Sequence, residues 1–164
     1  MRLAVAIPAY EAAFSVGAVI AGCRVHVPDV LVIDDGSHDA TGAAARAAGA
    51  EVRRVDVNRG KGHALRLAFD ELFGRGVDAV ITVDADGQHI PGEIPRLLAL
   101  APEADLVLGT RAHLFAQMSG LRRGANRLSS RAISFAAGAP FDDVQTGYHL
   151  YTRELIARTG FPEA

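Results

Sequence analysis

The chain has 164 residues, of which 49% are hydrophobic and 22% charged, the length and composition of one globular domain with a buried core. Its formal net charge of -2 argues against a general nucleic-acid-binding surface, because such a surface requires an excess of basic residues. The single cysteine, Cys23, cannot form an intrachain disulfide and therefore favours a reducing, cytoplasmic compartment.

Short apolar runs alternate with segments of helical periodicity along the whole chain. The expected strands, in chain order, are residues 3–7, 30–33, 51–55, 79–83 and 106–108. The expected helices are residues 13–21, 41–48, 64–73, 92–100 and 121–137. Several strands are continuously apolar, as expected where helices cover both faces of a parallel sheet. The pattern predicts an α/β fold with a mostly parallel sheet flanked by helices.

Residues 3–22 also allow a different interpretation, as an export signal. They are rich in apolar residues, and residues 20–23 look like a bacterial lipoprotein cleavage box. However, Pro8, Tyr10 and Glu11 interrupt the apolar run, and this interruption favours a buried strand followed by a helix over an export signal. No apolar run in the chain approaches the ~20 residues that are needed to cross a bilayer.

Polar clusters follow the ends of the predicted strands. In an open parallel sheet, ligands bind beyond the carboxyl ends of the strands, so these clusters are the first place to look for a site. They are Pro8-Ala9-Tyr10, Asp34-Asp35-Gly36-Ser37, Asn58-Arg59-Gly60-Lys61-Gly62, Asp84-Ala85-Asp86-Gly87-Gln88 and Gly109-Thr110-Arg111.

The segment Asp84-Ala85-Asp86-Gly87-Gln88 predicts a metal site. Two carboxylates that lie one residue apart after a buried strand repel each other, and a cation is the simplest compensation. The oxygen ligands Asp84, Asp86 and Gln88 suit Mg²⁺ or Mn²⁺, which would also hold phosphate groups. The alternative is a solvated Asp-Gly turn that ends the strand.

Two further clusters indicate contacts with a nucleotide. The pair Asp34 and Asp35 can accept hydrogen bonds from a base or a ribose, while Ser37 or Asp39 is expected to cap the following helix. Lys61, the only lysine, is flanked by glycines at a helix start and indicates a nearby anion. A flexible turn with a solvated lysine is the alternative.

Six segments, taken in order, resemble the motifs of family-two glycosyltransferases of the GT-A fold. The likeness is greatest to dolichyl-phosphate mannose and polyprenyl-phosphate glycosyl synthases, and it spans residues 4–151. The segments are residues 7–10, 32–37, 58–62, 84–89, 109–111 and 143–148. The resemblance implies that the chain is a single catalytic domain, with a nucleotide-sugar-binding half at 1–111 and a partial acceptor half at 112–164.

The resemblance also implies roles for individual residues. Asp84, Asp86 and Gln88 would surround Mg²⁺ or Mn²⁺, and Asp143 and Arg111 would act in catalysis. Arg123, Arg127 and Gln145 are candidates for contacts with phosphate or with the acceptor. The donor contacts would be Pro8, Ala9, Tyr10, Asp34, Asp35, Lys61, Asp84, Ala85 and Asp86.

The expected reaction is metal-dependent transfer of a sugar, with inversion, from a nucleoside-diphosphate sugar to a polyprenyl phosphate or a hydroxyl. Such a protein would be cytoplasmic and peripheral to the inner face of the membrane. An uncovered sheet edge would allow a homo-oligomer. The chain departs from the family pattern at Glu11 and Ala12, where Asn-Glu is common, and at His149, where a basic residue is common.

Three alternatives share some of these features. A donor-binding relative without turnover would act as a binding or partner subunit. A haloacid-dehalogenase-type phosphatase also has an Asp-x-Asp-Gly segment, but it has Thr or Val where Gln88 stands and a downstream lysine. A nucleotidyltransferase would have a glycine-rich loop after the first strand, where residues 8–17 contain one glycine.

Overall fold

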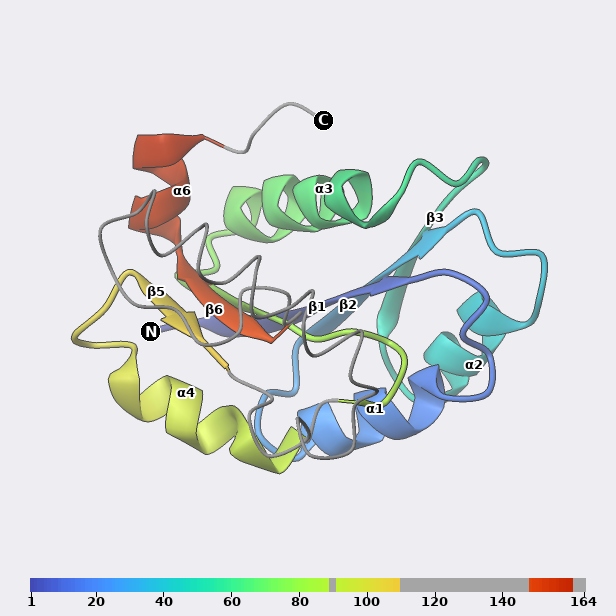
Figure 1. Cartoon of the computed structure of the whole chain (residues 1–164), viewed down its shortest axis with the longest axis horizontal. Coiled ribbons are helices and arrows are strands. Elements are labelled where there is room, and N and C mark those ends of the chain that lie inside the picture. Colours follow the sequence, from blue (N-terminus) through green and yellow to red (C-terminus); the bar gives the residue numbers. More distant parts are fainter. Residues whose placement is uncertain (89–90, 110–147, 161–164) are drawn as a thin grey trace, which may run out of the picture.

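The computed structural model describes residues 1–88, 91–109 and 148–160. Within them, helices cover both faces of one sheet (Figure 1). The strands are β1 (Leu3–Ala9), β2 (Val30–Asp35), β3 (Glu51–Val55), β4 (Ala79–Thr82), β5 (Leu106–Leu108) and β6 (His149–Thr152). The helices are α1 (Val16–Arg24), α2 (Thr41–Ala47), α3 (Lys61–Gly74), the short 3₁₀ helix η1 (Pro91–Glu93), α4 (Ile94–Leu100) and α6 (Arg153–Thr159). The helix expected at 121–137 lies outside the described residues.

The strands lie in the order β3-β2-β1-β4-β6-β5. The first four pair with one another in parallel, whereas β6 is antiparallel to both β4 and β5. The prediction of a mostly parallel α/β sheet is therefore confirmed. The sequence reasoning did not identify β6 or α6, although His149, Leu150, Tyr151 and Thr152 alternate between half-buried and buried positions as strand residues do.

Two layers of helices enclose the sheet (Figure 1). On one face α3 packs Ala64, Ala68, Phe69 and Leu72 against the alternate side chains of β1 and β2, and α6 adds Ile156. On the other face α1 and α4 pack against β1, β4 and β6, with α2 beside them. Because both faces are covered, β2 and β4 are buried along their whole length, which explains the apolar runs at residues 30–33 and 79–81.

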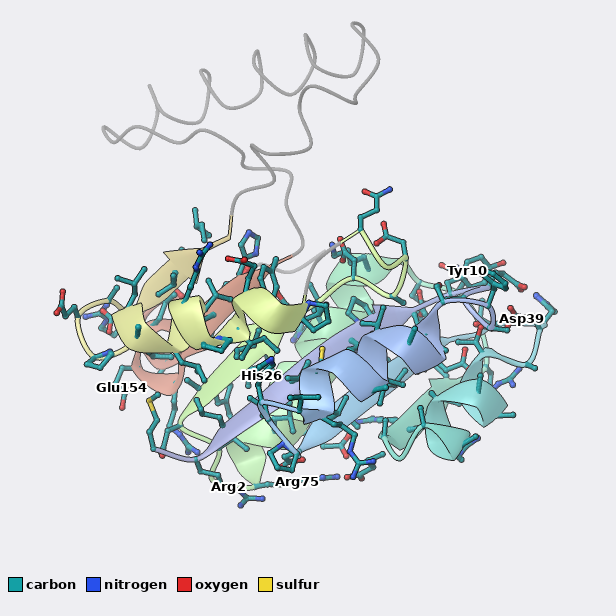
Figure 2. The ribbon with its side chains drawn as sticks, turned by 90° about the horizontal axis from the view of Figure 1, so that it is seen from below. Arg2, Tyr10, His26, Asp39, Arg75 and Glu154 are labelled. Carbon is teal, nitrogen blue, oxygen red and sulfur yellow. The ribbon has the colours of Figure 1, made fainter. Side chains whose placement is uncertain are left out.

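The carboxyl ends of β1, β2 and β4 lie together at one end of the sheet. Ala9 at the end of β1 is in register with Asp34 of β2, and on its other side β1 pairs with β4. Chain order therefore reverses at β1, which is the point where such sheets bind ligands. Tyr10 and Asp39 lie at this end of the molecule, away from Arg2 and Arg75 (Figure 2). Across residues 1–88, 91–109 and 148–160, no helix combines the length and apolarity of a membrane span.

Candidate active site

Two adjoining cavities lie beyond the carboxyl ends of β1, β2 and β4. Both are lined by Pro8 and Tyr10, so the segment that follows β1 forms a wall common to the two. The first, of about 270 Å³, is also lined by Ala9, Asp35, Asn58, Gly60, Lys61 and Ala64. The second, of about 400 Å³, is also lined by Glu11, Ala12, Phe14, Ser15, Asp84, Ala85 and Asp86. Residues from four predicted clusters therefore meet at one place.

Asp35 and Asp34 have different environments although they are neighbours in sequence. The Asp35 carboxylate lines the first cavity and accepts hydrogen bonds from the backbone amides of Arg59 (3.1 Å) and Gly60 (2.7 Å). These bonds fix the loop at residues 58–60, which forms another wall of the first cavity. Asp34 is fully buried, and its Oδ1 accepts a hydrogen bond of 3.0 Å from the amide of Ser37. The geometry gives Asp34 a role in shaping the turn, and its direct contact with a donor stays a prediction.

The loop after β1 is held by the loop after β2. The backbone amide of Glu11 donates to Ser37 Oγ at 3.0 Å, and that of Ala12 donates to Thr41 Oγ1 at 2.7 Å. Asp39 accepts from the amides of Ala13 and Thr41. These bonds hold Glu11 at a φ of 49°, which is an uncommon conformation for a residue with a side chain.

Ser37 and Asp39 were the two predicted caps of α2. Asp39 accepts a hydrogen bond of 2.9 Å from the backbone amide of Thr41, the first residue of this helix. The N-cap position itself is Ala40, which provides no side-chain bond. Hydrogen bonding, first of all from the Thr41 hydroxyl, lowers the pKa of Asp39. The carboxylate therefore stays charged while it joins the start of α2 to the loop after β1.

The loop after β4 carries the two predicted metal-binding carboxylates. Asp84 and Asp86 both line the second cavity, and Asp84 forms an ion pair with Lys61. Asp86 Oδ1 accepts the backbone amide of Gln88 at 2.9 Å, and Gly87 makes the turn with a φ of 76°, which glycine adopts without steric cost.

Ser15 connects the loop after β4 to the start of α1. Its Oγ donates to the carbonyl of Ala85 at 2.6 Å, so Ala85, itself a predicted donor contact, stays between the two carboxylates at the cavity wall. The loop is thus braced from α1 on one side and from α3, through Lys61, on the other.

The two carboxylates fit a divalent metal of the Mg²⁺ type. Such an ion retains several waters and is usually held by one or two carboxylates together with substrate phosphates, rather than by a full protein cage. Among the described residues no group of three or more His, Cys, Asp or Glu side chains converges. Gln88, predicted as a third ligand, is exposed and lines neither cavity; its role as a ligand stays a prediction.

Several predicted residues lie outside the part of the chain that the structure describes. They are Arg111, Arg123, Arg127, Asp143 and Gln145. Conversely, the structure adds wall residues that the sequence reasoning did not select, among them Ser15, Phe14 and Ala64. The sequence indicated Ser15 only through its position shortly after the predicted cluster Pro8-Ala9-Tyr10. Ala64 belongs to the apolar side of α3 and has no chemical signature of its own.

The order of the described strands, the antiparallel placement of β6 and an acidic loop after β4 together define a protein of the GT-A glycosyltransferase fold. The chain belongs to glycosyl transferase family 2, whose family pattern matches residues 4–160. The predicted resemblance is thereby confirmed.

Named relatives fall within the polyprenyl-phosphate branch of this family. The chain is 33% identical to an undecaprenyl-phosphate mannosyltransferase from Micrococcus luteus, over 95% of this chain and 68% of the relative. It is 32% identical to a polyprenol monophosphomannose synthase from Mycolicibacterium smegmatis, over 96% of this chain and 64% of the relative. The chain thus spans about two thirds of the length of these relatives.

A solved structure shares the fold at lower sequence identity. It is glucosyl-3-phosphoglycerate synthase from Mycobacterium tuberculosis in complex with Mn²⁺, UDP-glucose and phosphoglyceric acid. The two chains superpose with a TM-score of 0.68 at 22% identity, over 94% of this chain and 58% of that one. This likeness concerns the fold.

Proposed function

We propose that this chain transfers a sugar from a nucleoside-diphosphate sugar to a polyprenyl phosphate, with a divalent metal at Asp84 and Asp86. The observation that carries the proposal is the junction of the two cavities. Lys61 lines the first and pairs with Asp84, which lines the second. A single ligand with a nucleoside at one end and a diphosphate at the other would span both.

The first cavity suits the nucleoside. Its walls combine the apolar surfaces of Pro8, Ala9 and Ala64 with the oxygen atoms of Asp35 and the polar side chain of Asn58. An apolar pocket with a few fixed polar groups is the usual form of a small-molecule site. Tyr10, 47% exposed, offers an aromatic surface at the mouth for a planar base.

The second cavity suits the diphosphate and the sugar. A divalent ion bound there would neutralise the charge that develops on the departing diphosphate. The M. tuberculosis enzyme, which shares the fold, was solved with Mn²⁺ and UDP-glucose, which supports a divalent metal. Lys61 adds a mobile positive charge at the same place, and Arg111 is proposed to add another.

The acceptor decides how much base catalysis is needed. A polyprenyl phosphate is already an anion near neutral pH, so Asp143 would mainly position it. Asp143 would act as a general base if the acceptor were a hydroxyl. Direct attack on the anomeric carbon would invert its configuration. The names of the two bacterial relatives favour the polyprenyl phosphate, and such an acceptor would draw the protein to the inner surface of the membrane.

A thermal-shift screen of UDP- and GDP-sugars, with and without Mn²⁺ or Mg²⁺, tests donor binding. A donor present at 100 times its Kd stabilises the native state by about 2.7 kcal/mol, so the true donor must raise the Tm in the presence of metal. The same donor is then incubated with a short-chain polyprenyl phosphate in detergent. Transfer supports the proposal, donor binding without transfer or hydrolysis indicates a binding subunit, and release of phosphate from simple phosphomonoesters instead would indicate a phosphatase.

A further inference from the structure

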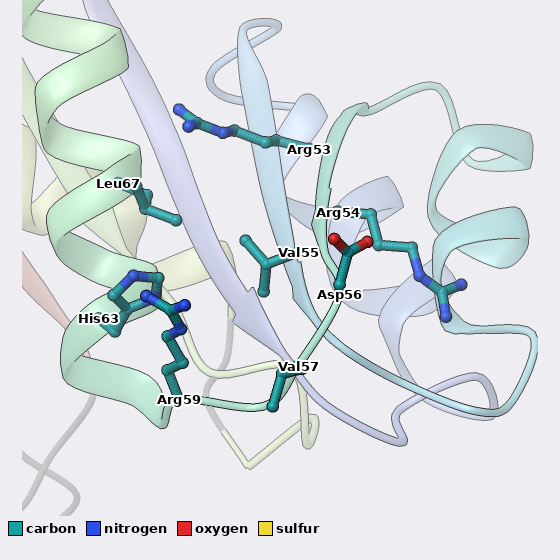
Figure 3. Close-up of a pocket in the computed structure, with 8 residues that line it drawn as sticks. All are labelled: Arg53, Arg54, Val55, Asp56, Val57, Arg59, His63 and Leu67. Atoms are coloured by element: carbon teal, nitrogen blue, oxygen red, sulfur yellow. The ribbon is translucent and has the colours of Figure 1, made fainter.

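Two neighbouring arginines of the edge strand β3 point to opposite sides of the sheet. Arg53 faces α3, whereas Arg54 lies on the other side of the strand (Figure 3). Arg53 Nη1 forms an ion pair of 3.1 Å with Glu71. Arg54 Nη2 donates a hydrogen bond of 2.6 Å to the backbone carbonyl of Ser37. The guanidinium of Arg54 therefore contacts the turn that connects β2 to α2, next to the nucleotide-sugar site.

Arg54 also approaches the buried carboxylate of Asp34. Its Nη1 lies 3.8 Å from Asp34 Oδ2, an atom that is buried and accepts no hydrogen bond within the described part of the chain. The close fit of α2 contributes to this burial, because a Cβ added at Gly42 would lie 2.8 Å from the same oxygen and 3.4 Å from Arg46 Nη1. A buried carboxylate is costly without a compensating cation. Arg54 supplies that cation, with Arg46 nearby on α2.

The turn that Arg54 holds supports both walls of the first cavity. Ser37 Oγ accepts the amide of Glu11 and so fixes the segment that carries Tyr10. Asp35, between Asp34 and Ser37, holds the loop at Arg59 and Gly60. Arg54 itself lines neither cavity of the site; it lines a separate groove of about 450 Å³ beside β3.

We infer that Arg54 is a positioning residue for the donor site, acting through the turn at residues 34–37. The inference rests on the proposed function for the identity of the ligand. A planar guanidinium can engage the Ser37 carbonyl and the Asp34 carboxylate at once, whereas a lysine presents a single point charge. Loss of Arg54 therefore lets the turn relax and enlarges the first cavity where the nucleoside binds.

The test compares Arg54→Met with Arg53→Met. Both variants remove one partly exposed arginine and one ion pair from the same strand. Arg54→Met also leaves the buried Asp34 carboxylate without this cation, so it should lower the Tm more, and donor affinity is compared at a temperature at which both variants are folded. Donor affinity is measured by calorimetry with the nucleotide sugar that the screen identifies. Amide hydrogen exchange of Glu11 and Ser37 is measured in the absence of donor. Arg54→Lys serves as the conservative variant.

The expected result is that Arg54→Met raises the Kd for the donor about tenfold, while Arg53→Met stays within twofold of the parent protein. Exchange at Glu11 and Ser37 accelerates in Arg54→Met alone, and Arg54→Lys lies in between. Equal donor affinity in the two methionine variants would overturn the inference. If the parent protein binds no nucleotide sugar, the proposed function fails, and unchanged exchange at Glu11 and Ser37 would then overturn the role of Arg54 separately.

Discussion

Lys61 and Asp84 form an ion pair that joins the first residue of α3 to the loop after β4. Asp84 is one of the two carboxylates proposed to hold the metal, and Lys61 is the only lysine of the chain. The ammonium group of Lys61 therefore acts as the counter-cation of the Asp84 carboxylate. The proposed metal would have to compete with this contact at Asp84, and the diphosphate of the proposed donor would offer Lys61 a new partner.

Replacement of Lys61 by methionine is expected to separate metal binding from donor binding. Without the competing ammonium, Mn²⁺ alone should bind up to about fivefold more tightly, the range of an ion pair between partly exposed side chains. The donor should bind more weakly, because its diphosphate loses a cation. Calorimetric titration with MnCl₂ and then with donor measures both. An unchanged Kd for Mn²⁺ would show that the ion pair does not compete with the metal.

Replacement of Asp86 by asparagine tests the metal site directly. The asparagine side chain has the size of the aspartate, and its Oδ1 can still accept the hydrogen bond from the backbone amide of Gln88. The substitution removes the negative charge of the oxygen ligand. The Kd for Mn²⁺ should rise at least about tenfold, since even residues that only orient ligands have effects of this size, and the metal-dependent part of the donor-induced Tm shift should disappear. Asp70→Asn, an exposed carboxylate on α3, is the matched control. A metal-dependent shift of full size in Asp86→Asn would exclude the assignment.

Gly36 is expected to tolerate no side chain. It has a φ of 77°, and a Cβ there would lie 2.7 Å from the backbone nitrogen of Asn58. Gly36→Ala combines an unfavourable backbone conformation with overpacking, so it should destabilise the fold by about 2–4 kcal/mol. Urea unfolding measures the loss. Gly74→Ala, in α3 with open space around the new methyl group, should change stability by no more than about 1 kcal/mol. Equal effects of the two substitutions would contradict the close approach of the loops at residues 36 and 58.

The lowered pKa of Asp39 predicts a pH-dependent contribution to stability. A carboxyl group whose pKa is lower in the folded than in the unfolded state stabilises the fold fully above the unfolded value, about 3.9. That contribution disappears as the pH falls through the folded value. Asp39→Asn does not titrate here, so the stability difference between parent and variant should be constant from pH 7 to 5 and shrink below pH 4. Urea midpoints at several pH values provide the measurement, and a difference that grows on acidification would contradict the sign.

The α/β class, the order of most elements and the meeting of the polar clusters beyond the strand ends were predictable from sequence. These features depend on local patterns: the continuously apolar runs of β2 and β4 and the polar clusters that follow them. Because parallel strands bring their carboxyl ends to the same end of a sheet, residues that are far apart in sequence could be assigned to one site before the structure was known. The strand β6 was missed because it has four residues, with Leu150 as its one aliphatic side chain, which is too short for an apolar run or an alternation to stand out in sequence.

Only the tertiary structure showed that residues adjacent in sequence have different environments and different contacts. Asp34 and Asp35 are chemically identical, and only the packing of α2 and of the loop at Arg59 determines that one is buried in a turn while the other lines a cavity. Likewise, the pair Arg53 and Arg54 gives no sign in sequence that Arg54 reaches Ser37. Such contacts depend on how separate elements meet in space, which local periodicity does not encode.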